Sequence, residues 1–153
     1  MDAADFSGWA TKANLRCSDG RTIQPEAFQE MDGQTVPLVW QHSHGEVTNV
    51  LGHAVLEARP EGVYAHGFFN DTAPGEHAKK LVHNKDIKSL SIYANNLVEK
   101  NKAVLHGVIR ELSLVLSGAN PGAVIENVRI AHSMNRDDDE TLQDEAIIEV
   151  GMD

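Results

Sequence analysis

Short runs of apolar residues, broken by turn residues, constrain the fold of this chain more than any other feature. Seven such runs cover residues 5–12, 36–41, 50–58, 63–69, 87–98, 103–116 and 124–130. Side chains on a strand point alternately to its two faces, so runs of this length and pattern are typical of strands. The Pro60–Gly62 turn predicts a hairpin between the third and fourth runs, and Gly8 predicts a bulge or a close approach of backbones. We therefore expect an antiparallel β domain with about seven strands.

Helical signals are few. Residues 74–84 form the clearest helix, which Asp71 or Thr72 would cap and Asn84 would end in a left-handed conformation. A single helical turn is expected at residues 25–28, where proline comes first. The predicted fold class is thus mainly β with one or two helices, and closing the sheet into a barrel would remove its exposed edges.

The net charge of −10 is concentrated at one end of the chain. Residues 134–153 hold eight acidic residues and one basic residue, a net charge of −7, which leaves −3 for residues 1–133. A block of like charges repels itself and stays solvated. Residues 142–150 could form a short amphipathic helix on a partner but would be disordered in isolation. We predict a globular domain at residues 1–133 and an acidic, disordered tail or linker at residues 134–153.

The composition argues against several classes of function. Binding to a nucleic-acid backbone requires clustered Lys and Arg, which this acidic chain does not offer. No apolar run approaches the ~18 residues of a membrane span, and the acidic start of the chain is unlike a signal peptide. Cys17 is the single cysteine, which excludes an internal disulfide and fits a reducing compartment. We expect a protein that is soluble and intracellular when it is made.

Two histidines follow the apolar run V-P-L-V-W-Q in the stretch Val36–His44. His42 and His44 would share a face of a continuing strand, and two imidazoles on one face could hold a metal. No third ligand stands at a recognisable spacing, so we expect no metal site and no cofactor. A solvated histidine or a general base are the other interpretations of His42.

Hydroxyl and carboxyl groups occur inside two later apolar runs. Ser89 and Ser91 lie on one face of the stretch K-S-L-S-I-Y, because strand side chains alternate. Glu111 and Ser113 share a face of the run 103–116, where an acid between apolar neighbours is unusual. A serine becomes a nucleophile only when a base within hydrogen-bond reach takes its proton, and a third group orients that base. The residues alone do not say which of the eight histidines would serve.

Several stretches, taken in order, resemble the prohead (capsid maturation) proteases of tailed bacteriophages. They are F-S-G-W-A at residues 6–10, S-D-G-R-T-I-Q-P-E-A-F at 18–28, V-P-L-V-W-Q-H at 36–42, S-L-S-I-Y at 89–93 and E-L-S-L-V-L-S-G-A-N-P at 111–121. This family is similar in fold to the herpesvirus assemblins, which are serine proteases built on a compact β-barrel. The resemblance spans residues 6–128 and implies a β-barrel protease domain at residues 1–133.

The resemblance also implies roles for single residues. His42 is expected to be the general base and Ser91 the nucleophile. Glu111 is the expected third member of the site, with His106 and Ser113 as alternatives. One departure is Tyr93, which follows Ile92 where many relatives have glycine, and which would reshape the pocket beside Ser91.

The implied function is that of a serine endopeptidase. Its expected substrates are the scaffold protein or the N-terminal extension of the major capsid protein, or both, and also itself. It would act inside the immature procapsid in the cytoplasm of the bacterial host. Self-association is a further expectation, whereas nucleic acid and membrane are not expected partners. The alternative is an inactive capsid-assembly or scaffold module that keeps the same barrel.

Overall fold

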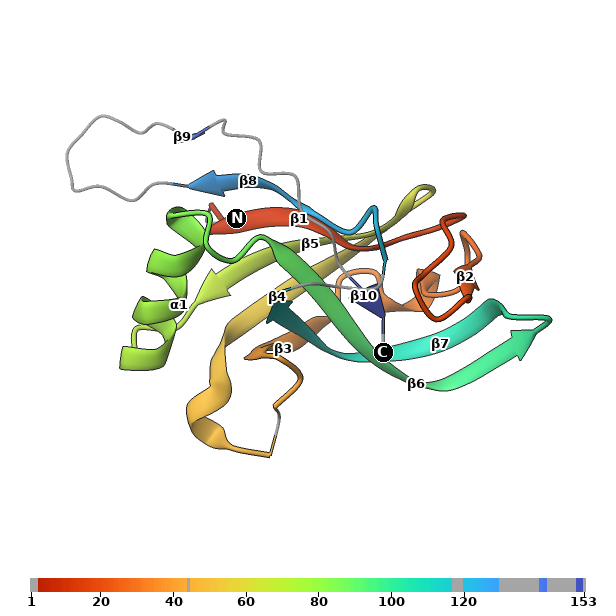
Figure 1. Ribbon diagram of the computed structural model, residues 1–153, viewed down its shortest axis with the longest axis horizontal. Coiled ribbons are helices and arrows are strands. Elements are labelled where there is room, and N and C mark those ends of the chain that lie inside the picture. Colours follow the sequence, from red (N-terminus) through yellow and green to blue (C-terminus); the bar gives the residue numbers. More distant parts are fainter. Residues whose placement is uncertain (1–2, 44, 117–119, 130–140, 143–150, 153) are drawn as a thin grey trace.

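The computed structural model describes residues 3–43, 45–116, 120–129, 141–142 and 151–152 (Figure 1). Its strands are β1 (Phe6–Lys12), β2 (Thr22–Ile23), β3 (Thr35–Trp40), β4 (Val50–Arg59), β5 (Gly62–Phe69), β6 (Ser89–Lys100), β7 (Ala103–Val115), β8 (Ile125–Arg129), β9 (Thr141–Leu142) and β10 (Gly151–Met152). The helices of the described residues are α1 (Ala73–His83) and two 3-10 turns, η1 (Gln29–Met31) and η2 (Val47–Asn49). The predicted mainly β class is confirmed.

The strands form one sheet in the order β10-β6-β7-β3-β4-β5-β1-β8-β9, with β2 beside β7. Most neighbours are antiparallel, but β3 and β7 run parallel, with Val39 opposite Ser113. The two halves of the sheet approach each other at a single bridge between Ser89 on β6 and Val124. No continuous strand ladder among the described residues joins them, so the expected closed barrel is wrong. A closed barrel requires each strand to be paired with a neighbour on both sides. Here β6 and the segment before β8 are joined by one isolated bridge and not by a ladder of hydrogen bonds.

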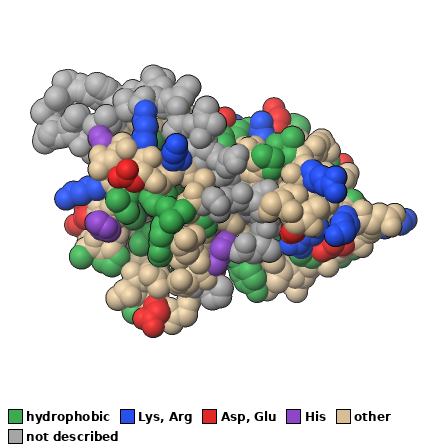
Figure 2. Space-filling view, in the orientation of Figure 1, with side chains coloured by type: hydrophobic (Ala, Val, Ile, Leu, Met, Phe, Trp, Pro, Cys, Tyr) green, Lys and Arg blue, Asp and Glu red, His purple; other side chains and the backbone are tan. Residues whose placement is uncertain are grey.

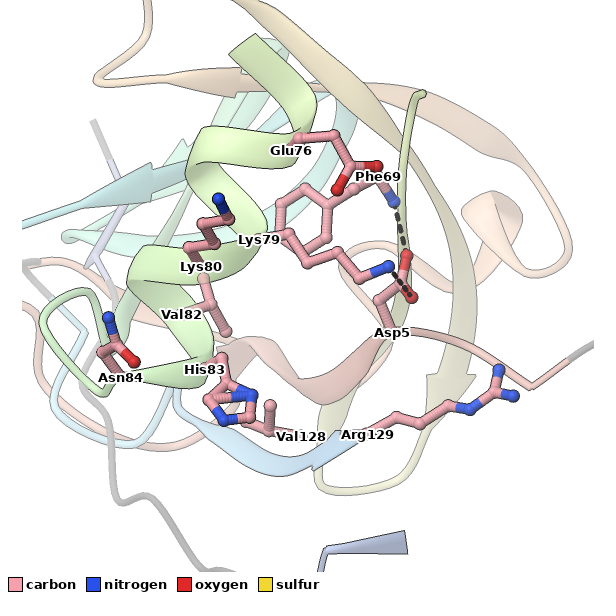
Figure 3. A pocket seen from close by; sticks show the side chains of 10 residues that line it. All are labelled: Asp5, Phe69, Glu76, Lys79, Lys80, Val82, His83, Asn84, Val128 and Arg129. Carbon is pink, nitrogen blue, oxygen red and sulfur yellow. Dashed lines mark hydrogen bonds and ion pairs between the residues drawn. The ribbon is translucent and has the colours of Figure 1, made fainter. Parts of the chain in front are cut away.

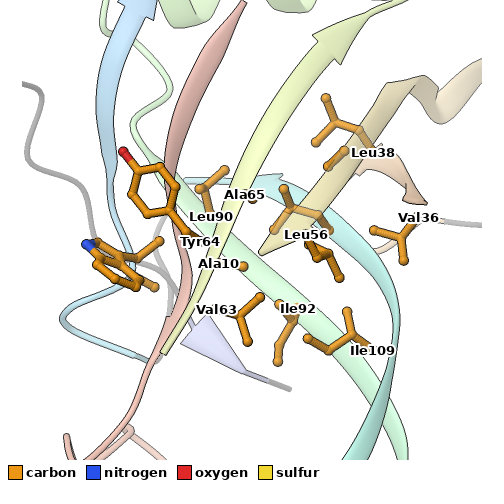
Figure 4. Close-up of a cluster of buried hydrophobic side chains, with 14 of the residues drawn as sticks. Ala10, Val36, Leu38, Leu56, Val63, Tyr64, Ala65, Leu90, Ile92 and Ile109 are labelled. Atoms are coloured by element: carbon orange, nitrogen blue, oxygen red, sulfur yellow. The ribbon is translucent and has the colours of Figure 1, made fainter. Parts of the chain in front are cut away.

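The core lies between the inner faces of this curved sheet (Figure 4). Strand alternation fills it with branched side chains such as Leu38, Leu56, Leu90, Ile92 and Leu112, each at most 1% exposed. Burying one such side chain contributes roughly 1.5–3 kcal/mol relative to leaving it in water. The opposite faces of β3, β6 and β7 are thereby left to carry polar groups.

Helix α1 begins and ends close to the predicted residues. Thr72 is the N-cap, and its Oγ1 accepts a hydrogen bond from the Gly75 N–H at 3.1 Å. The C-cap Asn84 is right-handed, with φ −80° and ψ −4°, and the left-handed residue is Lys85, with φ 67°. The predicted left-handed end at Asn84 is therefore wrong by one residue. Likewise, residues 25–28 form turns and the helical turn starts only at Gln29.

Most of the predicted acidic tail lies outside the described residues, as do His44 and the turn residues 117–119. Two short strands of the tail are described. Thr141 lies opposite Arg129 on β8, and Gly151 lies opposite Ser91 on β6. The backbone of Gly151 and Met152 thus runs along the strand that carries Ser91.

Gly8 lies where the backbone of β1 closely approaches the backbone at the start of β8. The register of the two strands shifts between Ser7 and Gly8, as expected of a bulge, and a Cβ at residue 8 would lie 1.9 Å from the Val124 carbonyl oxygen. We predict that Gly8→Ala lowers the free energy of unfolding by about 1–3 kcal/mol, because the backbones must move apart. Urea unfolding measures this. Gly45→Ala is the matched control, because no atom of the described residues, its chain neighbours aside, lies within 4 Å of its added Cβ. Equal stabilities of the two variants would contradict the prediction.

No helix in the described part of the chain is long and apolar enough to cross a membrane. Acidic and basic side chains are mixed over the face seen in Figure 2, and basic groups gather around the end of the β6–β7 hairpin. The hairpin turns through Asn101 and Lys102, both with positive φ.

Candidate active site

Three adjacent strands place the site residues on one face of the sheet. Ser91 on β6 lies opposite Ser113 on β7, and Ser113 lies opposite Val39 on β3. Glu111 is two residues before Ser113 and therefore shares its face. Residues far apart in sequence meet here because β7 is the common neighbour of β3 and β6.

A sharp turn after β3 brings His42 back over this face. Gln41 and His42 both have left-handed backbones, with φ 51° and 59°, which is uncommon for residues other than glycine. The Gln41 N–H donates to the Leu114 carbonyl at 2.9 Å, and the His42 N–H donates to Ser113 Oγ at 2.9 Å. Strained residues of this kind persist where the surrounding contacts hold them, and they cluster at functional sites.

The imidazole of His42 bridges the two serines. Its Nε2 lies 2.8 Å from Ser91 Oγ, and its Nδ1 lies 3.1 Å from Ser113 Oγ. Behind them, Ser113 Oγ donates to Glu111 Oε1 at 3.0 Å, and Glu111 Oε1 is 3.5 Å from His42 Nδ1. The four side chains thus form a continuous hydrogen-bonded chain.

The tautomer of His42 follows from the single proton of the Ser113 hydroxyl. A hydroxyl donates one hydrogen bond and accepts two, whereas a carboxylate only accepts. Because Ser113 donates to Glu111, it accepts from the His42 N–H and from Nδ1. We therefore assign the ring proton to Nδ1, which leaves the lone pair of Nε2 directed at Ser91.

The four hydrogen-bonded side chains differ in their exposure to solvent. Ser91 is 2% exposed, Glu111 3% and Ser113 fully buried, while the side chain of His42 is 19% exposed. Charged interactions are stronger in such low-dielectric surroundings than in water. A buried carboxylate behind a partly exposed imidazole is suited to stabilise positive charge that forms on the ring.

Residues 2–137 match the protein family described as the Caudovirus prohead serine protease. The chain belongs to this family. The match covers most of the 153 residues and confirms the resemblance found from the motifs. Searches of the curated proteins and of the solved structures found no significant match.

Membership of the prohead protease family sets the general activity. The protein is a serine protease of phage capsid maturation, and its substrates belong to the capsid precursor, within which it is located.

The three candidates for the third member of the site lie in different places. Glu111 and Ser113 both contact His42, whereas His106 lies further along β7, opposite Val98. His106 is 42% exposed, and its Nε2 is 3.1 Å from Glu30 Oε1. The fold therefore brings Glu111 and Ser113 to His42, and it places His106 in a pair with Glu30.

The left-handed turn at Gln41 and His42 was not predicted from the sequence. Glycine is the usual local signal of positive φ; histidine is enriched there among the other residues but adopts it rarely, and glutamine gives no such signal. The turn is held by hydrogen bonds to Ser113 and Leu114 on β7, about 70 residues away, and the local sequence does not reveal these contacts.

Other features of the described surface lie apart from this site. The cavity of about 400 Å³ in Figure 3 lies between α1, β1 and β8, and its charged lining includes Asp5, Glu76, Lys79 and Arg129. Lys79 Nζ is 3.7 Å from Asp5 Oδ1. Among the described residues, no group of three or more His, Cys, Asp and Glu side chains is arranged to hold a metal ion.

Proposed function

We propose that this protein is a Ser–His endopeptidase that cleaves the scaffold protein, the N-terminal extension of the major capsid protein, or both, and also itself, inside the immature procapsid. The observation that carries the proposal is the 2.8 Å contact between His42 Nε2 and Ser91 Oγ. Membership of the prohead protease family supports the substrate class. The named substrates rest on the motif resemblance.

Ser91 is the nucleophile and His42 the general base. His42 Nε2 takes the hydroxyl proton as Ser91 Oγ attacks the scissile carbonyl carbon, which forms a tetrahedral intermediate. The imidazolium then returns this proton to the leaving amine as the C–N bond breaks, and an acyl ester remains on Ser91. Water, activated by the same imidazole, hydrolyses the ester and regenerates the free hydroxyl.

Glu111 is the third member of the site, and Ser113 connects it to the base. When His42 accepts the proton, its positive charge forms about 3.5 Å from the buried carboxylate. The resulting attraction lowers the energy of the charged intermediate relative to the resting state. Ser113 holds both the backbone N–H and Nδ1 of His42, so it fixes the ring in the tautomer that leaves Nε2 unprotonated.

Labelling with a fluorophosphonate tests this proposal directly. A fluorophosphonate reacts with an activated serine and not with an ordinary one, because only an activated hydroxyl is sufficiently nucleophilic. We expect a single adduct per chain, located on Ser91 by peptide mass spectrometry, and no adduct in Ser91→Ala. Ser89, which shares the face of Ser91, is the internal control. A labelled Ser89 with an unmodified Ser91 would refute the assignment, as would a folded chain that cleaves its substrate and takes up no label.

A further inference from the structure

Strand β6 has a sparsely paired edge beside Ser91 in the described part of the structure. One side of β6 pairs with β7 along its length, and the other side pairs, among the described residues, only with Val124 at Ser89 and with the two-residue strand β10. The unpaired N–H and C=O groups of an edge strand are a template for adding another extended chain. An extended peptide added to this edge would pass directly along the proposed nucleophile.

A segment of the same chain already lies on this edge. Strand β10 runs parallel to β6, with Gly151 opposite Ser91 and Met152 opposite Ile92 (Figure 1). With β10 in place, Ser91 is 2% exposed. A substrate peptide and β10 therefore require the same backbone groups of β6.

Strand β10 is tethered to the domain, which favours it over a free substrate peptide in the competition for the β6 edge. Only eight residues separate β10 from β9, which pairs with β8. A short linker holds the segment that it carries at an effective concentration on the order of millimolar. A substrate at lower concentration finds the edge open for only part of the time. Its apparent dissociation constant is then the intrinsic one divided by the fraction of time in which the edge is open.

We propose that the β6 edge at Ser91 is the peptide-docking edge of the protease, and that Gly151–Met152 occupies it as an intramolecular competitor of substrate. This inference rests on the proposed function, because it takes Ser91 as the nucleophile. The segment acts as an inhibitory strand, and its displacement or removal activates the enzyme.

Proline substitutions in β10 test the inference, because proline lacks the N–H that a strand donates to its neighbour. In a parallel pair, alternate residues direct their backbone groups to the neighbouring strand, so Gly151→Pro and Met152→Pro together cover both possibilities. The matched control is Leu142→Pro, which changes β9 opposite Val128 and leaves β10 intact. Intact mass must show that each chain retains residues 151 and 152 during the assay.

We expect one of the two β10 variants to lower KM for the capsid-protein substrate by about three- to tenfold with kcat unchanged, as for an edge open a tenth to a third of the time. In a Ser91→Ala background, which prevents self-cleavage, the same variant should speed amide hydrogen exchange in residues 89–93. Leu142→Pro should change neither quantity. Unchanged KM or unchanged exchange in both β10 variants overturns the inference.

If Ser91 is not the nucleophile, the experiments give a different result from the one expected if only the inhibitory strand is wrong. In that case Ser91→Ala retains cleavage, while the exchange experiment, which needs no catalysis, still reports whether β10 covers the edge. Loss of cleavage in Ser91→Ala together with no effect of either proline variant overturns only the inhibitory strand.

Discussion

Ser91→Ala and His42→Ala should each abolish measurable cleavage when the protease is co-expressed with the capsid protein on which it acts. General-base catalysis is typically worth ~10²–10⁴ in rate. We therefore expect His42→Ala to lower kcat/KM at least about 100-fold, which is at least about 3 kcal/mol of transition-state stabilisation. Ser91→Ala removes the nucleophile itself and should be at least as severe. Gel electrophoresis of the capsid protein and kinetics with purified protein measure the two losses.

Ser91 and His42 are expected to act as one catalytic unit, so their substitutions should not have additive effects. Because neither group works without the other, the double variant should cleave no more slowly than the single variants. Ser89→Ala is the matched control, since Ser89 is on the same strand and face but lies opposite Val115 rather than Ser113. Circular dichroism should show that all variants are folded. Capsid-protein cleavage that continues in folded Ser91→Ala would refute the nucleophile assignment and favour the inactive-module interpretation of the chain.

Glu111→Gln should lower kcat/KM by about 100-fold or more, with the loss in kcat rather than KM. Glutamine keeps the size of the side chain but carries no charge, so the imidazolium that forms at His42 loses its buried counter-charge. Binding of the substrate precedes this charge and is left largely unchanged. Steady-state kinetics with purified capsid protein separate the two parameters.

His106→Ala serves as the control for Glu111→Gln. His106 pairs with Glu30 in an exposed position, so we expect kcat/KM to remain within about threefold of the wild-type value, as for surface substitutions away from a site. Ser113→Ala should fall between the two, because it keeps the charge of Glu111 but loses the contacts that orient His42. A loss of cleavage in His106→Ala, with full activity in Glu111→Gln, would show that the third member was chosen wrongly.

The local pattern of the sequence predicted the elements well and their ends less well. Alternation marked all seven long strands, and Thr72 was one of the two caps proposed for α1. These features depend on residues only a few positions apart, because side-chain directions repeat every two residues in a strand and about every 3.6 in a helix. The errors at Asn84 and at residues 25–28 are shifts at element ends, where side-chain contacts from elsewhere decide the last turn.

The site required more than local pattern. Spacing placed Glu111 and Ser113 on one face, but it did not choose His42 from eight histidines or connect it to Ser91, 49 residues away. The resemblance to a family supplied that pairing. Ser113 was only an alternative third member, and its position between His42 and Glu111 became evident from the order of β3, β7 and β6.

The sequence by itself determined a mainly β chain of the prohead protease family, because strand periodicity and ordered motifs are properties of the chain alone. Only the tertiary structure decided that the sheet stays open, that a left-handed turn carries His42 over Ser91, and that Gly151 lies opposite the same serine. The physical reason is register. A shift of one residue between paired strands would move every side chain to the other face, and that register is set by contacts between segments distant in sequence.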